Sequence, residues 1–208
     1  MSTGELSGRQ RRHSRTREAI LREALVMMTG GGSEAIVLRE LAQRLDYSPA
    51  ALYRYFVSRE EIISTLTEES MAMLVDHLRG ALASGEIDPL GAVGVGYLAF
   101  AREEPVRFQL LFTEMPSTRV GLDDLAADGS AYAIVLDTAR EALSEGRIAS
   151  RLDAESVAYT LWALVHGMAV LEATHLRGFD AQFDRLHEQA IAQLIRGWQE
   201  PNDGGGAR

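Results

Sequence analysis

Hydrophobic residues recur along most of the chain at the spacing of an α-helix. Ile20, Ala24 and Met28 repeat every four residues, and later apolar segments keep a similar period, as expected where one face of each helix is buried. No segment alternates apolar and polar residues in the manner of a half-buried strand. The pattern therefore predicts an all-α fold of about nine helices, although three glycines between residues 91 and 96 weaken one of them. These helices cover about residues 14–29, 38–45, 49–55, 58–83, 88–102, 104–114, 131–145, 153–176 and 180–200.

Helix start and stop signals gather between residues 38 and 61. Asp46 follows the first short apolar face, Ser48 is a favoured N-cap, and Pro49 stands at the first helical position. Ser58 with Glu61 three residues later forms a capping box, which opens the long helix that follows. Two short helices joined by a tight turn describe a helix-turn-helix unit, which inserts its second helix into the DNA major groove.

Charge is divided unevenly along the chain, although the total is a net charge of −9. Residues 1–60 hold ten Arg against seven Asp and Glu, whereas residues 61–208 hold eleven Arg against 23 Asp and Glu. Because nucleic acid repels an acidic surface, we expect DNA contacts only in the basic part. The predicted organisation is a disordered basic tail (1–13), a helix-turn-helix DNA-binding domain (14–60), a ligand-binding and dimerisation domain (61–200) and a flexible tail (201–208).

Several classes of protein are excluded by what the sequence lacks. The chain has no Cys, so it has no disulfide, thiolate metal site or cysteine nucleophile. Its five His lack metal-ligand spacing, Gly30–Gly32 lacks the Lys-Ser/Thr of a phosphate-binding loop, and no nucleophile is set beside a base. We therefore expect no enzyme, no cofactor and no metal. Residues 1–17 are polar and no apolar run approaches about 18 residues, so we expect no membrane partner and a cytoplasmic location.

Residues 38–56 read Leu-Arg-Glu-Leu-Ala-Gln-Arg-Leu-Asp-Tyr-Ser-Pro-Ala-Ala-Leu-Tyr-Arg-Tyr-Phe, and residues 58–61 read Ser-Arg-Glu-Glu. This sequence resembles the DNA-binding domain of TetR-family transcriptional regulators, over about residues 14–62. Residues 105–108 (Pro-Val-Arg-Phe), 110–112 (Leu-Leu-Phe) and 162–167 (Trp-Ala-Leu-Val-His-Gly) resemble a TetR C-terminal domain marked by Trp, His and Gly. That second resemblance extends in pieces over about residues 85–198.

The resemblance implies an α-helical homodimer that binds a palindromic operator, usually as a repressor, and that is released by a small effector. In this hypothesis the effector moves the helix over residues 58–83 and thereby changes the spacing of the two DNA-reading helices. An activator of the same family and a DNA-binding protein without a ligand both remain open.

The resemblance also assigns the residues that would meet DNA. Tyr53 and Arg54 correspond to positions that reach bases or nearby phosphates, and Arg59 corresponds to a basic phosphate-binding position. The full predicted set is Arg39, Ser48, Ala50, Ala51, Tyr53, Arg54, Tyr55 and Arg59. Two residues depart from the family pattern. Val37 cannot cap the helix over residues 38–45, and Asp46 occupies the turn position where glycine is common. The Arg-rich residues 9–17 either follow the DNA backbone or are simply solvated.

A pocket for a small hydrophobic effector is expected behind the long helix, where aromatic residues and two His are frequent. Its predicted lining is Met73, His77, Tyr97, Phe100, Phe108, Leu111, Phe112, Met115, Tyr132, Trp162 and His166. The helix over 153–176 is apolar on more than one side, so we expect it to join the last helix in a four-helix bundle across a two-fold axis. The predicted interface residues are Leu164, Gly167, Met168, Leu171, Phe183, Leu186, Ala190 and Leu194.

Overall fold

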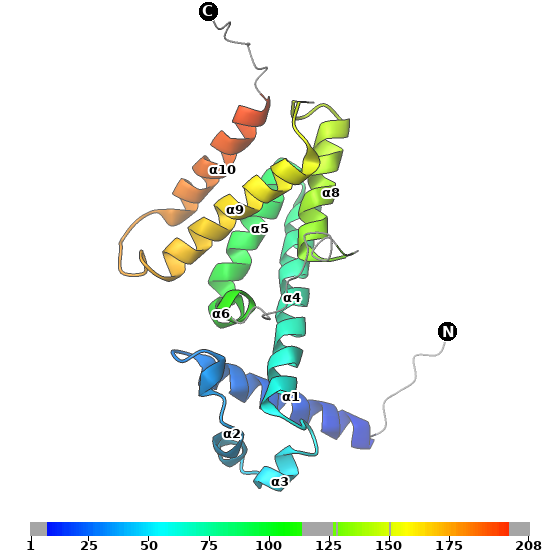
Figure 1. The fold of residues 1–208 in the computed structure, drawn as a ribbon, viewed down its shortest axis with the longest axis vertical. Coiled ribbons are helices and arrows are strands. Elements are labelled where there is room, and N and C mark those ends of the chain that lie inside the picture. The colour runs from blue at the N-terminus through cyan, green and yellow to red at the C-terminus, as the bar shows by residue number, and fades with distance from the viewer. Residues whose placement is uncertain (1–7, 114–126, 128, 150, 200–208) are drawn as a thin grey trace, which may run out of the picture. The chain divides into compact units, whose positions relative to one another are not determined.

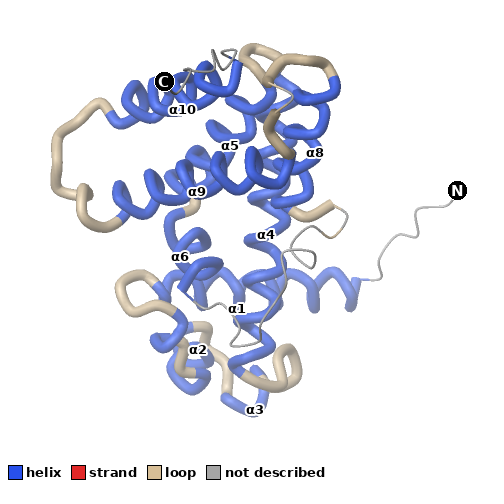
Figure 2. Tube along the Cα trace, turned by 45° about the horizontal axis from the view of Figure 1, so that its top comes forward, coloured by secondary structure: helices blue, strands red, loops and turns tan. Residues whose placement is uncertain are grey.

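The computed structural model describes residues 8–113, 127, 129–149 and 151–199. These residues form nine α-helices and one short 3-10 helix, without any strand, as predicted (Figures 1 and 2). The elements are α1 (Gly8–Met28), η1 (Ser33–Ala35), α2 (Leu38–Arg44), α3 (Pro49–Leu52), α4 (Arg59–Ser84), α5 (Pro89–Glu103), α6 (Pro105–Thr113), α8 (Ala131–Ser144), α9 (Ala154–Ala173) and α10 (Phe183–Gln199).

The chain divides into two compact units. The first takes in Met1–Ser70 and Val106–Met115, and the second takes in Met71–Pro105 and Pro116–Arg208. Helix α4 crosses the division, and most of α6 belongs to the first unit although it follows α5 in sequence. The predicted boundary near residue 60 therefore differs from the structure, in which the first three turns of α4 and most of α6 complete the N-terminal unit.

The first unit is built around one buried cluster. The repeat of Ile20, Ala24 and Met28 faces this cluster, as predicted, and Leu110 of α6 joins it. The buried side chains are Ile20, Leu21, Ala24, Met27, Met28, Ile36, Leu41, Ala42, Leu52, Phe56, Ile62, Leu66 and Leu110. Burying aliphatic side chains contributes about 1.5–3 kcal/mol each, so this cluster holds the short helices α2 and α3, which are too short to be stable alone.

Helix α1 begins earlier than the sequence pattern indicates. We predicted a disordered tail through residue 13, but residues 8–13 are helical. Their side chains are all exposed, so no apolar period marks this stretch. Hydrogen bonds from Ser14 to Glu18 and from Thr16 to the Arg12 carbonyl belong to the same continuous helix.

The helix-turn-helix has the local geometry that its capping residues predict. Asp46 lies in the left-handed region with φ 57°, which Asp tolerates better than most residues. Ser48 accepts a hydrogen bond from the Ala51 N–H at 3.2 Å, and Pro49 occupies the first turn. Val37 precedes α2 without any side-chain cap, as predicted. Helix α3 ends at Leu52 rather than at Tyr55, because the following N–H groups bond back over shorter, irregular turns.

Helix α5 packs against α8, α9 and α10 in the second unit. Its glycines are sites of close approach rather than helix breaks. A Cβ at Gly94 would lie 3.0 Å from Ile191 Cδ1, and one at Gly96 would lie 2.8 Å from the His77 carbonyl oxygen. The predicted weakness of this helix is therefore wrong, since tertiary contacts offset the cost of about 1 kcal/mol for each helical glycine.

Helices α9 and α10 are both shorter than predicted. Helix α9 ends at Ala173 because Thr174 leaves helical geometry, while its N–H and hydroxyl bond to the Val170 carbonyl. Helix α10 begins at Phe183, three residues after the predicted start. Within the described residues, α9 is the one helix long and apolar enough to cross a membrane, a property that core helices of soluble proteins share. Here α9 packs on α5, α8 and α10.

Candidate functional site

The surface of the helix-turn-helix is the first candidate site. The first unit holds all eight residues that we predicted for DNA contact. Five of them are exposed, namely Arg39, Ser48, Ala50, Tyr53 and Arg54, and three are half-buried, namely Ala51, Tyr55 and Arg59. Within residues 8–113 neither Arg39 nor Arg54 takes part in an ion pair, so both guanidinium groups are available to an external anion. Helix α3 and the two residues that follow it thus combine small side chains with an exposed aromatic ring and a cation.

Tyr55 is held between two rings beyond the end of α3. Its ring centroid lies 4.9 Å from that of His13 and 6.3 Å from that of Tyr47. The ring therefore contributes to the packing of the unit, in addition to any contact through its hydroxyl. Because His13 lies on the helical extension of α1, this stack also fixes the basic start of α1 beside the segment that follows α3.

Arg17 braces the same segment, a role that the sequence did not reveal. Its guanidinium donates a hydrogen bond to the Tyr55 carbonyl oxygen, lies 3.9 Å from the centroid of the Phe56 ring, and is 3.6 Å from Glu61. We had counted Arg17 among the residues of a basic arm. These contacts instead tie α1 to the segment after α3, and thereby set the orientation of that short helix.

Arg59 and Arg44, also near the helix-turn-helix, are engaged in ion pairs. Arg59 donates to Ser33 Oγ and to Glu34, each at 3.2 Å. Arg44 pairs with Glu40 at 2.9 Å and Glu23 at 3.1 Å, and hydrogen bonds to these two carboxylates raise its pKa. The predicted phosphate contact of Arg59 would therefore compete with its pair to Glu34.

A chain of aromatic and imidazole rings forms the second candidate site, inside the second unit. The Tyr97 hydroxyl is 2.9 Å from His166 Nδ1, and Trp162 lies between His166 and Tyr132 with ring centroids 6.3 and 5.8 Å away. Burial raises the pKa of Tyr97 and lowers that of His166. The phenol therefore keeps its proton, and its O–H can donate a hydrogen bond to the neutral imidazole. Four of the predicted pocket residues are brought together in this ring cluster.

The rest of the predicted pocket is divided between different places. His77 bonds to the Met73 carbonyl at 2.8 Å and to Glu103 at 3.2 Å, and its ring packs on Phe100. Burial lowers the His77 pKa, but these two hydrogen bonds outweigh it, so the pKa is raised. Phe108, Leu111 and Phe112 belong to the first unit, and Met115 lies outside the described residues. The predicted lining is therefore not one continuous pocket within either unit.

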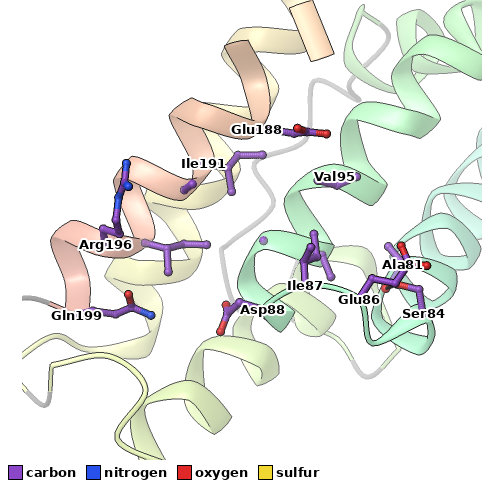
Figure 3. Close-up of a pocket in the computed structure, with 14 residues that line it drawn as sticks. Ala81, Ser84, Glu86, Ile87, Asp88, Val95, Glu188, Ile191, Arg196 and Gln199 are labelled. Carbon is purple, nitrogen blue, oxygen red and sulfur yellow. Dashed lines mark hydrogen bonds between the residues drawn. The ribbon is translucent and has the colours of Figure 1, made fainter. Parts of the chain in front are cut away.

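The second unit contains a groove that none of the predicted pocket residues lines. It has a volume of about 640 Å³ and lies between the end of α4, the first half of α5, and α10 (Figure 3). Sequence patterns could not indicate it, because its existence depends on small residues of α5 that face α10 across the helix interface.

Arg102 is the centre of an ion-pair network that the sequence also did not indicate. It donates to Glu172 of α9 at 3.0 Å, to Asp184 of α10, and to His187 Nδ1 at 3.1 Å. Burial lowers the pKa of His187, Glu172 raises it and Arg102 lowers it, with a net decrease. The network joins three helices of the second unit, and burial keeps His187 neutral within it.

The residues predicted for a dimer interface lie on outward faces of α9 and α10. Leu171 and Leu186 are 47% and 46% exposed, although both are large apolar side chains. No atom comes within 4 Å of a Cβ built on Gly167. The other predicted members, namely Leu164, Met168, Phe183, Ala190 and Leu194, are half-buried. These apolar residues, here called the α9–α10 stripe, are thus partly or largely accessible in the single chain.

Comparison with known proteins identifies the family of both parts of the chain. Residues 20–66 match the family described as bacterial regulatory proteins of the tetR family, and residues 90–194 match the family described as the tetracyclin repressor-like C-terminal domain. The first match includes the helix-turn-helix, and the second includes most of the chain from α5 to α10.

Individual relatives agree with these matches. The chain is 34% identical over 70 residues to the HTH-type transcriptional regulator TcmR of Streptomyces glaucescens, and 36% identical over 86 residues to the HTH-type transcriptional repressor KstR of Mycolicibacterium smegmatis. These alignments cover 32% and 41% of this chain, and only 31% and 41% of the respective relatives. The crystal structure of the proposed regulatory protein SCO4313 matches 91% of this chain and all of its own, with 27% identity and a TM-score of 0.72.

The two family matches together extend over most of the described residues, and the helical architecture agrees with that of a solved structure over nearly the whole chain. Members of this family bind DNA, generally as dimers, and regulate transcription rather than catalyse a reaction. The chain belongs to the TetR family of transcriptional regulators.

Proposed function

We propose that the protein is a ligand-responsive repressor that acts as a homodimer on a palindromic operator in the cytoplasm. The observation that carries this proposal is the exposed, braced end of α3. Ser48 caps the helix, Arg17 bonds to the segment that follows it, and Tyr53 and Arg54 extend into solvent between these two anchors. A rigid support of this kind is what base recognition requires, because a mobile side chain loses the specificity of its hydrogen bonds.

Base recognition is assigned to Arg54. Ala50 and Ala51 are assigned to contacts with thymine methyl groups of the operator. The major groove is about 12 Å wide and admits one helix, and small side chains let that helix enter deeply. Arg54 is exposed and outside any ion pair of residues 8–113, so its planar guanidinium is free to bond to both acceptors of a guanine edge. Arg39, Ser48, Tyr55 and Arg59 are assigned to phosphates, which fix register but carry no sequence information.

Dimerisation is assigned to the α9–α10 stripe. A soluble protein rarely leaves a continuous apolar surface exposed unless a partner covers it. A second copy placed across a two-fold axis would cover the stripe with an identical stripe, as symmetric interfaces do. In such a dimer the two α3 helices would read successive major grooves about 34–36 Å apart.

The effector site is assigned to the ring cluster of Tyr97, Tyr132, Trp162 and His166. Its apolar faces suit a hydrophobic effector, and its few hydroxyl and imidazole groups would orient that effector by hydrogen bonds. Helix α4 belongs to both units, so a shift of α4 on effector binding would reach Arg59 and the helix-turn-helix. A tenfold loss of operator affinity requires about 1.4 kcal/mol of coupling free energy. The name of the relative KstR supports repression as the direction of control.

Selection from a random duplex pool with the purified full-length protein tests the central claim. Enrichment of a palindrome with half-sites about one helical turn apart is the expected result. If the folded dimer enriches no motif, or enriches one unpaired half-site, the proposal of a palindromic operator fails.

The dimer is tested by sedimentation with substitutions on the stripe. Leu171→Glu and Leu186→Glu should each convert dimers to monomers, because both place a charge on the apolar surface. Met71→Glu is the matched control, since Met71 is 39% exposed on α4 and outside the stripe. Dimers that resist both stripe variants would exclude this interface.

The effector site is tested with a single-tryptophan reporter. The chain has two Trp, so Trp198→Phe leaves Trp162 as the only indole fluorophore. The hydrophobic aromatic dye anilinonaphthalene sulfonate should accept energy from Trp162 and quench its emission on binding. His166→Leu should then weaken dye binding, and binding without any quenching of Trp162 would place the site elsewhere.

A further inference from the structure

The groove between α5 and α10 is large enough to hold a small molecule. Its volume of about 640 Å³ lies within the range of about 300–1,000 Å³ that ligand pockets occupy. It contains no residue of the ring cluster, and its α10 residues do not include Ala190 or Leu194 of the α9–α10 stripe. The groove is therefore separate from both the proposed effector site and the proposed dimer interface.

Small residues of α5 and branched residues of α10 form the apolar part of the groove. Gly91 and Ala92 face Ile191 and Ile195 across the two helices. A Cβ on Gly91 would still be 3.7 Å from Ile195 Cδ1, so the glycine leaves space where most side chains would fill it. Ile87 stands at the rim and is 50% exposed. An apolar occupant would cover this side chain and remove the unfavourable free energy of its exposure to water.

Two exposed carboxylates give the rim its charge. Within the described residues, Glu86 and Glu188 take part in no ion pair and both are exposed. Asp88 is already neutralised by Arg147 at 3.3 Å, and its other oxygen accepts the Leu90 N–H. Arg196 is the cationic residue of the lining. Its side chain extends to the side of α10 turned away from α5, whereas Glu188 extends toward α5 (Figure 3).

The charge of the surrounding sequence acts in the same direction. Residues 61–208 carry 23 acidic residues against eleven Arg, so the field around the groove attracts cations and repels anions. An apolar floor with two rim carboxylates is complementary to a molecule with a hydrophobic body and one positive charge. Because the rim stays in contact with water, such a charge would keep much of its hydration and would not incur the full cost of burial.

We propose that this groove is a second small-molecule site, which binds hydrophobic organic cations such as bulky amines, quaternary ammonium ions and phosphonium ions. The hydrophobic body lies on Gly91, Ala92, Ile191 and Ile195, and the cationic centre lies toward Glu86 and Glu188. The site does not depend on operator binding or on the proposed effector cluster.

Calorimetry with two probes of the same shape and opposite charge tests the ligand class. Tetraphenylphosphonium should bind the full-length protein with one site per chain, and tetraphenylborate should bind more weakly. Glu86→Gln and Glu188→Gln should each weaken phosphonium binding about two- to fivefold, the range for exposed charge pairs. Glu141→Gln, on an exposed position of α8, removes the same charge outside the groove and should leave the affinity unchanged.

A blocking variant tests the location. Ala192→Phe places a ring at an exposed position of the groove wall and should abolish phosphonium binding, while Ala83→Phe on α4, outside the lining, should not. If Ala192→Phe fails to fold, the two Glu→Gln variants still decide the question. The proposal is overturned if the borate binds as well as the phosphonium, if no phosphonium binds, or if Trp162→Leu removes binding and the groove variants do not.

Discussion

Replacing Gly96 with alanine should destabilise the protein, although alanine is the better helix former. The added Cβ would lie 2.8 Å from the His77 carbonyl oxygen and 3.0 Å from Ala81 Cβ. Neither atom can rotate aside, so α4 and α5 would have to move apart. Overpacking of this kind costs about 1–3 kcal/mol, and the gain in helix propensity is about 0.8–1 kcal/mol. We therefore expect a net loss of up to about 2 kcal/mol.

Alanine substitutions at two other glycines distinguish the effect of helix propensity from the effect of packing. At Gly80 of α4 no atom lies within 4 Å of a built Cβ, so Gly80→Ala should stabilise the protein by about 0.5–1 kcal/mol through propensity alone. At Gly91 the nearest atoms are 3.7 Å away, so Gly91→Ala should stabilise by a similar amount. The difference between Gly96→Ala and Gly80→Ala then measures the tightness of the α4–α5 contact.

Urea unfolding followed by far-ultraviolet circular dichroism measures all three variants at one protein concentration. The midpoint should fall for Gly96→Ala and rise for the other two, with unchanged slopes. If Gly96→Ala raises the midpoint as much as Gly80→Ala does, the close approach of α4 and α5 is not as described and the reasoning is refuted.

Four further predictions concern the DNA surface and the ion-pair network. Val37→Thr should stabilise the protein by about 0.5–1 kcal/mol in urea, because it supplies the missing cap of α2, and an unchanged midpoint would contradict this. Arg54→Ala should cost about 1–3 kcal/mol of operator binding and relax specificity at one base pair in competition assays. Arg59→Ala should weaken all sequences alike and flatten the salt dependence, so a sequence-selective loss would refute the phosphate assignment. Arg102→Met should raise the pKa of His187 in an NMR titration, because the Arg102 cation opposes protonation. In the wild type the lowered His187 pKa means that the unfolded chain takes up the proton first, so this contribution to stability is lost as the pH falls below about 6.5.

Features that depend on a few neighbouring residues could be predicted from the sequence. The left-handed Asp46, the Ser48 cap and the missing cap at Val37 all follow from local backbone chemistry. The buried face of α1 follows from a repeat over three turns. In each case the deciding contacts lie within one or two helical turns, and a sequence displays these directly.

Features that depend on distant residues could not be predicted. Arg17 reaches Tyr55, 38 residues away, whereas its position in a run of arginines was equally compatible with a DNA contact and with a solvated side chain. Gly96 reduces the helix propensity of α5, and only the approach of α4 explains why glycine is needed there. The groove is a volume left between side chains of three elements, so no residue pattern marks it. Four of the residues predicted for the pocket nevertheless lie together, because α5, α8 and α9 pack side by side, and their role in effector binding stays a prediction.

The apolar character of α9 has a consequence for how the protein is made. Helix α9 is long and apolar enough to cross a membrane, yet only 28% of an apolar 18-residue stretch within it is buried in the single chain. Helices α5 and α8 precede α9 and are synthesised before it, whereas α10 ends 26 residues after Ala173. At about 5–20 residues per second, those residues take roughly 1–5 seconds to add.

During that interval the nascent chain offers chaperones and the membrane-targeting machinery a helix that is covered on one side only. Folding of α10 shortens the exposure but does not end it, because the α9–α10 stripe stays open. Under the dimer proposed above, final protection requires an encounter between two finished chains, so its rate depends on the square of their concentration. A regulator made in few copies would therefore spend the longest time in this vulnerable state.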